Sequence, residues 1–227
     1  AASDVYKRQV YASLDDLLSN QEKKDFEKLV GMNHSLAQTV KQCKATISYP
    51  PNGLPMLLYG PTGTGKSLIA KLTYEWARNQ GVISKDGQFV QVNCSEYANN
   101  PELLTANLFG HVKGAFTGAE KDNEGLIALA DNGVLFLDEV HELKAECQEK
   151  LFLFMDQGIY HRVGDNEKWY KSNVRIVFAT TENPDKVLLK TLMRRIPMTI
   201  TIPSLEQRGT QERIEPVSYT HLRPHET

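Results

Sequence analysis

Five short apolar runs recur along the chain, and each is followed by turn-forming residues or by a helical pattern. We predict that they form strands, at 54–59, 89–93, 134–139, 173–179 and 198–202. The run at 134–139 has no polar position before its two final carboxylates, which is expected of a strand whose faces are both covered by helices. Strands that alternate with helices form a parallel, doubly wound sheet. The pattern therefore predicts an α/β fold in which a parallel five-stranded sheet lies between helices.

Apolar residues at helical spacing fill the intervals between the strands. One helix is expected to start at Asn33, a residue type that caps helices, and it has these apolar positions: Leu36, Val40, Cys43 and Ile47. Other helices are predicted after residue 67, at 101–108, at 124–131 with Gly133 in its C-cap region, at 144–155 and after Pro184. A hairpin is predicted where 159–163 and 168–171 flank the turn at 164–166.

The run from Tyr59 to Ser67 has the form G-x-x-x-x-G-K-S, the phosphate-binding loop of nucleoside triphosphatases. It follows a predicted strand and precedes a predicted helix, which is the context that this motif requires. Glycines allow backbone N–H groups to close around phosphate oxygens, and the new helix points its positive end at the same anion. Lys66 is expected to reach the β- and γ-phosphates, and Ser67 to ligate Mg²⁺. The ATP-binding residues predicted in this loop are Gly60, Pro61, Thr62, Gly63, Thr64, Gly65, Lys66 and Ser67.

Two carboxylates, Asp138 and Glu139, end the apolar run that begins at Val134. They are expected at the sheet edge where doubly wound folds bind ligands. Asp138 is expected to hold Mg²⁺, directly or through water. Glu139 is expected to orient and polarise the attacking water, as a general base does in phosphoryl transfer. Such a pair is also typical of a solvated strand end, and the phosphate-binding loop upstream favours the catalytic interpretation.

Polar residues at other strand ends have two interpretations each. Asn93 could hydrogen-bond the catalytic carboxylate or make a local turn bond, and spacing alone favours the turn. The hydroxyls of Thr180 and Thr181 could sense the γ-phosphate or cap the next helix. Arg194 and Arg195 could reach a neighbouring subunit's nucleotide and stabilise transition-state charge, or form a solvated or salt-bridged pair.

Composition narrows the class of protein. The 227-residue chain has 26 basic and 28 acidic side chains, a balance that argues against a nucleic-acid-coating surface. No apolar run approaches the roughly 18 residues of a membrane span, and no secretory signal is visible. Three cysteines, Cys43, Cys94 and Cys147, have no C-x-x-C spacing. We expect them to be buried thiols in a reducing cytoplasm.

Both ends of the chain look foreign. One short DNA sequence can encode residues 4–9, and its reverse complement can be translated as residues 217–222. This pattern resembles read-through of a transposon-type sequencing adapter. Residues 1–9 and 217–227 are therefore excluded from fold reasoning. Residues 10–28 are expected to form a short helix and a linker. The natural protein is expected to continue beyond both ends.

One further loop carries a family resemblance. It reads GAFTGA at Gly114, Ala115, Phe116, Thr117, Gly118 and Ala119. Its glycines and its phenylalanine in a polar setting favour an exposed loop. With the phosphate-binding loop and the two strand-end carboxylates, it resembles the AAA+ ATPase domain of bacterial enhancer-binding proteins, the activators of sigma-54 RNA polymerase. The stretches 49–54, 181–184 and 194–197 are similar to activators of the levansucrase-operon type, which carry phosphotransferase-system regulation domains and control sugar-uptake operons.

The resemblance implies that residues 29–210 form an AAA+ core, the sigma-54 interaction domain, which uses ATP and Mg²⁺. It implies a homo-hexameric ring with ATP sites between subunits. The GAFTGA loop would contact the sigma factor, and ATP hydrolysis would remodel the closed promoter complex. Promoter DNA would be bound only by other domains, and no membrane would be involved. Gly31 joins the expected ATP-binding residues, and Asn93 takes the position of the residue that restrains the catalytic glutamate.

The sequence departs from the family pattern at several positions. The γ-phosphate sensor, commonly Thr-Asn, is here Thr180-Thr181. Of two arginines often found before the last strand, one aligns with Arg194, whereas the other position is Leu188. The small helical lid is missing before the adapter-like end, so the chain as written is expected to hydrolyse ATP weakly.

Two other functions compete with the activator hypothesis. A different AAA+ machine, such as a protein unfoldase or a helicase loader, would share the ATP site but has no reason to carry the GAFTGA loop. A nucleotide-gated scaffold without turnover is disfavoured, because Lys66, Asp138 and Glu139 are all present.

Overall fold

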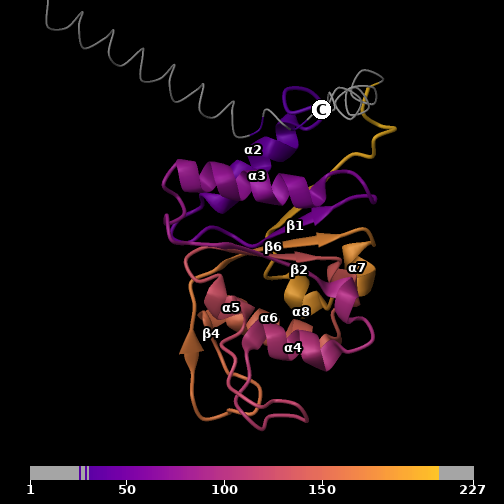
Figure 1. Cartoon of the computed structure of the whole chain (residues 1–227). Helices are drawn as coiled ribbons and strands as arrows, with labels where there is room; N and C mark the ends of the chain where they lie inside the picture. The colour runs from indigo at the N-terminus through magenta and orange to yellow at the C-terminus, as the bar shows by residue number, and fades with distance from the viewer. Residues whose placement is uncertain (1–25, 27–28, 30, 210–227) are drawn as a thin grey trace, which may run out of the picture.

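A computed structural model of the chain describes residues 26, 29 and 31–209, in which helices cover both faces of a sheet (Figure 1). Both adapter-like segments, and the predicted linker apart from Phe26, lie outside the described residues. Within the described part, no helix has the length and apolar character of a membrane span.

The central sheet has five parallel strands, as the sequence predicts, and their order is β2-β3-β6-β1-β7. The strand bounds are β1 Met56–Tyr59, β2 Phe89–Asn93, β3 Val134–Asp138, β6 Arg175–Thr180 and β7 Met198–Thr201. Because β6 pairs with both β1 and β3, the segments that follow these three strands meet at one edge of the sheet.

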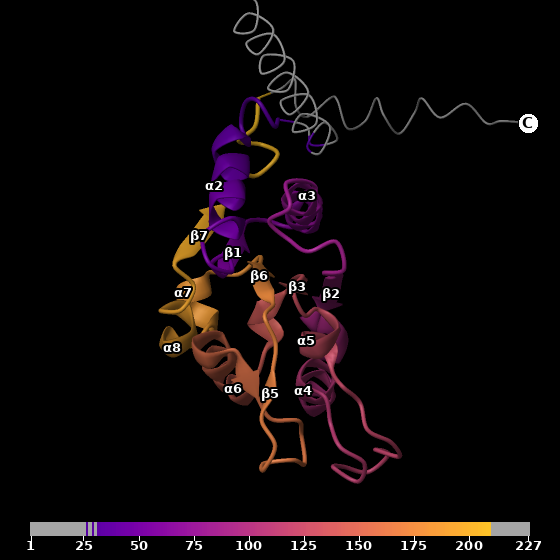
Figure 2. The ribbon, with the colours of Figure 1, turned by 90° about the vertical axis from the view of Figure 1, so that its left-hand side faces the viewer.

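Helices form a layer on each face of this sheet (Figures 1 and 2). One layer consists of α2 (Ala37–Ile47) and α3 (Lys66–Asn79). The other consists of α4 (Pro101–Phe109), α5 (Leu126–Leu129) and α6 (Ala145–Gln157). The described residues also form the helices η1 (Cys94–Tyr97), η2 (Val140–Glu142), α7 (Pro184–Val187) and α8 (Lys190–Met193). The predicted hairpin is present as β4 (Ile159–Tyr160) paired antiparallel with β5 (Tyr170–Lys171).

Alternate residues of the central strands supply two separate cores. In β3, Leu135 and Leu137 pack into the core beneath α4 and α6, whereas Val134 and Phe136 pack into the core beneath α2 and α3. All four side chains are fully buried. Successive side chains of a strand point to opposite faces, so a strand between two helical layers needs apolar residues at every position. This requirement explains the unbroken apolar run that identified β3 in the sequence.

The three cysteines are free and buried, which confirms the expected buried thiols. Burial raises the pKa of the Cys43 thiol to about 12 and that of Cys147 to about 11, and it also raises the pKa of Cys94. A thiol in such surroundings is a poor nucleophile.

Two predicted helices are clearly shorter in the structure. The first helix was expected to begin at Asn33 but begins at Ala37, with no side-chain cap, although its four predicted apolar positions are all buried. The Gly31 carbonyl accepts hydrogen bonds from the N–H groups of His34 and Leu36, and these bonds hold the preceding residues in turns.

The helix predicted at 124–131 is shorter, because α5 spans only Leu126–Leu129. Gly125 has a φ of +85°, which ends the helix on its N-terminal side. A Cβ atom added to Gly125 would lie 2.3 Å from the backbone nitrogen of Gly110, so the two backbones touch there. The periodicity of the apolar residues could not show this contact between distant segments.

The segment 110–125 is a long loop that runs out beyond the α4–α6 layer, beside the β4–β5 hairpin (Figures 1 and 2). Its two stems exchange backbone hydrogen bonds between His111 and Asn123, of 3.0 and 2.8 Å. The hairpin is bound to the same stem, because Val112 donates to Val163 and Val163 donates to Gly110. The base of the loop is therefore fixed to both neighbours.

We predict that Phe136→Ala lowers the free energy of unfolding by roughly 3–5 kcal/mol, because truncation of a fully buried phenylalanine leaves a cavity between β3 and its covering helices. Urea unfolding followed by circular dichroism measures this change. Leu129→Ala is the control, since that side chain is 50% exposed. A loss below about 1 kcal/mol for Phe136→Ala would contradict the two-core description.

Candidate nucleotide-binding and hydrolysis site

The loop between β1 and α3 has the backbone shape that its glycines permit. Gly63 and Gly65 have φ values of +77° and +91°, and Gly65 is the N-cap of α3. Such values strain any residue with a Cβ atom. The loop therefore ends where the helix N-terminus begins, and backbone N–H groups at a helix N-terminus bind anions.

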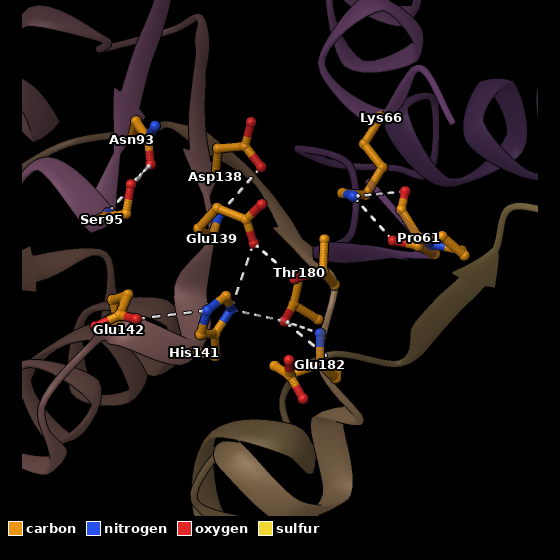
Figure 3. Close-up of polar contacts among 12 residues, drawn as sticks. Pro61, Lys66, Asn93, Ser95, Asp138, Glu139, His141, Glu142, Thr180 and Glu182 are labelled. Carbon is orange, nitrogen blue, oxygen red and sulfur yellow. Dashed lines mark hydrogen bonds and ion pairs between the residues drawn. The ribbon is translucent and has the colours of Figure 1, made fainter. Parts of the chain in front are cut away.

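Lys66 is the first residue of α3 and is buried. Its ammonium donates to the carbonyl oxygens of Gly60 and Pro61, at 2.8 and 3.2 Å. Figure 3 shows the side chain turned back toward Pro61. The positive charge is thus held inside the loop, and phosphate oxygens can replace these carbonyls as its partners.

A hydrogen bond joins the phosphate-binding helix to the acidic strand end. Ser67 Oγ donates to Asp138 Oδ2 at 2.9 Å, and the other oxygen, Asp138 Oδ1, accepts from the backbone N–H of Glu139 at 3.0 Å. A hydroxyl and a carboxylate are oxygen ligands that fit Mg²⁺. The described residues contain no cluster of three or more His, Cys, Asp or Glu side chains suited to a metal. This donor set therefore fits an ion that keeps water and phosphate as its other ligands.

Glu139 has an unusual backbone. Its φ and ψ are 51° and 49°, in the left-handed region that disfavours residues with a side chain. Strain of this kind is retained where the surrounding structure over-determines it, and it is concentrated at functional sites. Here it ends β3 and starts η2, so that the Glu139 side chain lies near the end of β6 (Figure 3). Thr181 Oγ1 donates to Glu139 Oε2 at 3.1 Å.

Thr180 ends β6 and is fully buried. Its hydroxyl oxygen accepts from the N–H of Glu182 at 3.1 Å and lies 3.3 Å from His141 Nδ1 (Figure 3). The capping alternative for the two threonines is not what the structure shows, because Asn183 caps α7 by accepting from the N–H of Asp185. The Thr181 hydroxyl instead contacts Glu139, and the Thr180 hydroxyl bonds to Glu182 and lies beside His141.

Asn93 makes the local turn bond that spacing alone favoured. Its Oδ1 accepts from the N–H and the hydroxyl of Ser95, at 3.1 and 2.8 Å, and so caps η1 (Figure 3). Among the described residues, no hydrogen bond joins Asn93 to Glu139. The contact that the resemblance implied is therefore not made in this structure.

The two arginines before β7 differ in their surroundings. Arg195 makes two hydrogen bonds to Asp156, of 2.7 and 2.6 Å, and its guanidinium lies 4.6 Å from the ring centroid of Phe152. The hydrogen bonds from Arg195 lower the pKa of the Asp156 carboxyl. Arg194 is exposed, and within the described part of the chain no hydrogen bond or ion pair reaches its side chain. The salt-bridge interpretation therefore applies to Arg195.

Gly31 lies outside this group, in the turn before α2, with a φ of +88°. Its part in nucleotide binding stays a prediction.

Arg208 contacts the phosphate-binding loop and was missed by the sequence analysis. Its side chain is 5% exposed, and its guanidinium donates to the carbonyl of Thr64 at 2.7 Å and to that of Pro203 at 3.2 Å. The sequence offers no signal for this role, because an arginine in a polar stretch after the last strand is normally solvated. Only the folded chain brings it beneath a loop 144 residues away.

Comparison with known families shows the family of this chain. The sequence model of the family described as the sigma-54 interaction domain matches residues 29–200. The chain belongs to the sigma-54 interaction domain family. The family predicted from the GAFTGA loop is thus confirmed.

Relatives of this sigma-54 interaction domain are bacterial regulators. The regulatory protein LevR of Bacillus subtilis (strain 168) is 51% identical over 189 residues, which cover 83% of this chain and 20% of LevR. DagR of Salmonella typhimurium (strain 14028s / SGSC 2262) is 45% identical over 192 residues, which cover 84% of this chain and 20% of DagR. The chain thus spans about a fifth of the length of these relatives. The similarity to LevR confirms the predicted regulator type.

Solved structures share the fold of this sigma-54 interaction domain. NtrX from Brucella abortus in complex with ATP matches with a TM-score of 0.65 and 26% identity, over 95% of this chain and 47% of NtrX. NtrX in complex with ADP matches with a TM-score of 0.67 and 24% identity, over 94% and 46%. The predicted AAA+ fold of P-loop type is confirmed.

We predict that Arg208→Ala speeds amide hydrogen exchange in the phosphate-binding loop of this sigma-54 interaction domain by roughly tenfold or more. The substitution removes charge-assisted hydrogen bonds to the carbonyls of Thr64 and Pro203, each of the order of 1.5–3 kcal/mol. Exchange measured by mass spectrometry over residues 60–67 tests this. Arg78→Ala is the matched control, since Arg78 makes an exposed bond to the Lys85 carbonyl. Equal exchange in both variants would show that Arg208 does not support the loop.

Proposed function

We propose that this domain hydrolyses ATP and uses the reaction to remodel the closed complex of sigma-54 RNA polymerase through its GAFTGA loop. The observation that carries the proposal is the hydrogen bond between Ser67 and Asp138, with Glu139 as the next residue. It brings a phosphate-binding helix, a ligand pair for Mg²⁺ and a carboxylate base to one edge of the sheet. These are the parts that phosphoryl transfer requires.

Each side chain has a defined task in the proposed reaction. The backbone N–H groups of the loop and Lys66 would hold the β- and γ-phosphates, and Ser67 and Asp138 would hold Mg²⁺, which neutralises phosphate charge when bound. Glu139 would accept the proton of the attacking water. Thr180, which ends β6, and Thr181, the next residue, would contact the γ-phosphate side of the site. The strand β6 lies between β1 and β3.

A physical route connects this site to the GAFTGA loop. The helix η1 contacts both η2, which follows Glu139, and α4, which leads into the loop. Asn107 of α4 donates to the Tyr97 hydroxyl of η1 at 3.2 Å, which fixes α4 to η1. A shift of η2 when the γ-phosphate binds or leaves would therefore move α4 and the loop base. Such a coupling supports a two-state nucleotide switch.

The loop tip offers a surface to a partner. Phe116 is 38% exposed and Thr117 is exposed, between Gly114 and Gly118 at φ values of +81° and +96°. The phenylalanine supplies an apolar anchor, and the threonine supplies a small hydrogen-bonding group. We propose that sigma-54 is the partner that contacts both.

The proposed assembly is a homo-hexamer inside a longer regulator. Relatives such as LevR are about five times as long as the matched segment, so we propose that regulatory and DNA-binding domains accompany this one and that the regulator controls a sugar phosphotransferase-system operon. Arg194, which is exposed, is the better candidate for an arginine that reaches a neighbouring subunit's nucleotide, because Arg195 is held by Asp156.

Glu139→Gln is predicted to keep ATP binding and to lower the rate of ATP hydrolysis by about a hundredfold or more, because the amide cannot take a proton from water. The measurement is phosphate release by the full-length regulator, together with the affinity for a fluorescent ATP analogue. Glu142→Gln is the control for removing a charge in η2. Unchanged turnover in Glu139→Gln would show that the base is a different group.

Thr117→Ala is predicted to leave ATP hydrolysis within about twofold of wild type while abolishing engagement of sigma-54, because Thr117 lies on the loop tip and not among the ATP-site contacts. The test mixes the full-length regulator with sigma-54 and ADP–aluminium fluoride, which mimics the γ-phosphate in flight, and detects a complex on a native gel.

Lys121→Ala, an exposed change in the same loop outside the motif, is the control and should form the complex. A complex that needs the analogue and disappears only with Thr117→Ala would support the activator. No complex, alongside normal hydrolysis, would favour another AAA+ machine.

A further inference from the structure

We propose that His141 is a positioning residue for Glu139. Together with Thr181 it holds one oxygen of that carboxylate, so that the other oxygen can accept the proton of the attacking water. This inference rests on the proposed ATPase function and adds a residue that the sequence motifs do not include. His141 lies in η2, two residues after the strained backbone of Glu139.

The contacts of Glu139 are all on one oxygen. Thr181 Oγ1 donates to Oε2 at 3.1 Å. His141 Nδ1 lies 3.4 Å from the same atom (Figure 3). Within the described part of the chain, no hydrogen bond reaches Oε1. Two groups on different elements, η2 and the segment after β6, therefore anchor one side of the carboxylate and leave the other side open to water.

The partners of the imidazole identify Nδ1 as a donor. Glu139 Oε2 belongs to a carboxylate, which only accepts when ionised. Thr180 Oγ1, 3.3 Å from Nδ1, also accepts from the N–H of Glu182, and its own proton is directed to the Glu182 carbonyl at 3.4 Å. Both neighbours of Nδ1 are thus acceptors, and we infer that this nitrogen carries a proton. The other nitrogen, Nε2, lies 3.5 Å from a carboxylate oxygen of Glu142.

These contacts hold the ring between two elements, with 21% of its side chain exposed. A glutamate side chain has three rotatable bonds, and a general base works only when its oxygen stays within hydrogen-bond reach of the proton that it removes. Asn93, the residue that the resemblance suggested for controlling Glu139, bonds to Ser95 and makes no hydrogen bond to Glu139 within the described residues. His141 and Thr181 are the side chains that contact this carboxylate within the described residues.

The decisive experiment compares three substitutions of His141 in the full-length regulator. Asparagine places an amide donor near the position of Nδ1, facing Glu139, whereas glutamine places it near Nε2, facing Glu142. We expect His141→Ala to lower kcat about tenfold and to leave KM within about twofold, because the lost contact orients the base and not the nucleotide. His141→Asn should restore kcat to within about threefold of wild type, and His141→Gln should not.

Affinity for a fluorescent ATP analogue and the melting temperature are measured for every variant and should stay near the wild-type values. If the wild type is active and His141→Ala leaves kcat unchanged, this inference is overturned while the proposed function stands. Equal rates for the asparagine and glutamine variants would have the same meaning. A parallel loss of affinity and melting temperature would also overturn it, since that pattern indicates a packing role. A wild type that binds ATP without hydrolysing it would overturn the proposed function as well.

Discussion

The parallel register of β1, β6 and β3 is the constraint on which the rest of this structure depends. Tyr59 at the end of β1 lies opposite Thr180 at the end of β6, and Leu137 of β3 lies opposite Phe178 of the same strand. The three strands therefore end within one residue of each other, and the three following segments come together. A slip of one residue would turn every side chain of a strand to the wrong face, so the two buried cores hold this register in place.

Conformational strain and flexibility have separate locations in the molecule. The strained residue, Glu139, lies where the sheet ends and is surrounded by hydrogen-bonding groups on η2 and after β6. Gly114 and Gly118, at which an added Cβ atom would meet no other atom, lie in the 110–125 loop, and both have positive φ values. A rigid reaction centre and a deformable contact surface are what a nucleotide-driven switch needs, and η1 and α4 lie between the two.

The sequence predicted most of the fold, because the signals for parallel strands are local. All five sheet strands and the hairpin were found, since consecutive apolar residues and turn residues mark them directly. The prediction was wrong where a distant backbone decides the boundary, as when the contact between Gly110 and Gly125 shortens α5. In the site, the motifs identified Lys66, Ser67 and Asp138, whose spacing is fixed by one loop and one strand. Arg208 and His141 were not identified, because their partners lie on other elements.

The closed base of the 110–125 loop has a consequence for how such a domain can diversify. His111 and Asn123 face each other across an antiparallel bridge, so the chain leaves the fold and returns to it at the same point. The entropy cost of such an excursion grows only slowly with its length. The stability of the core therefore depends little on the number and kind of residues beyond the bridge. The loop is a site where evolution, or a protein engineer, can exchange one sequence for another while the candidate ATP site remains as it is.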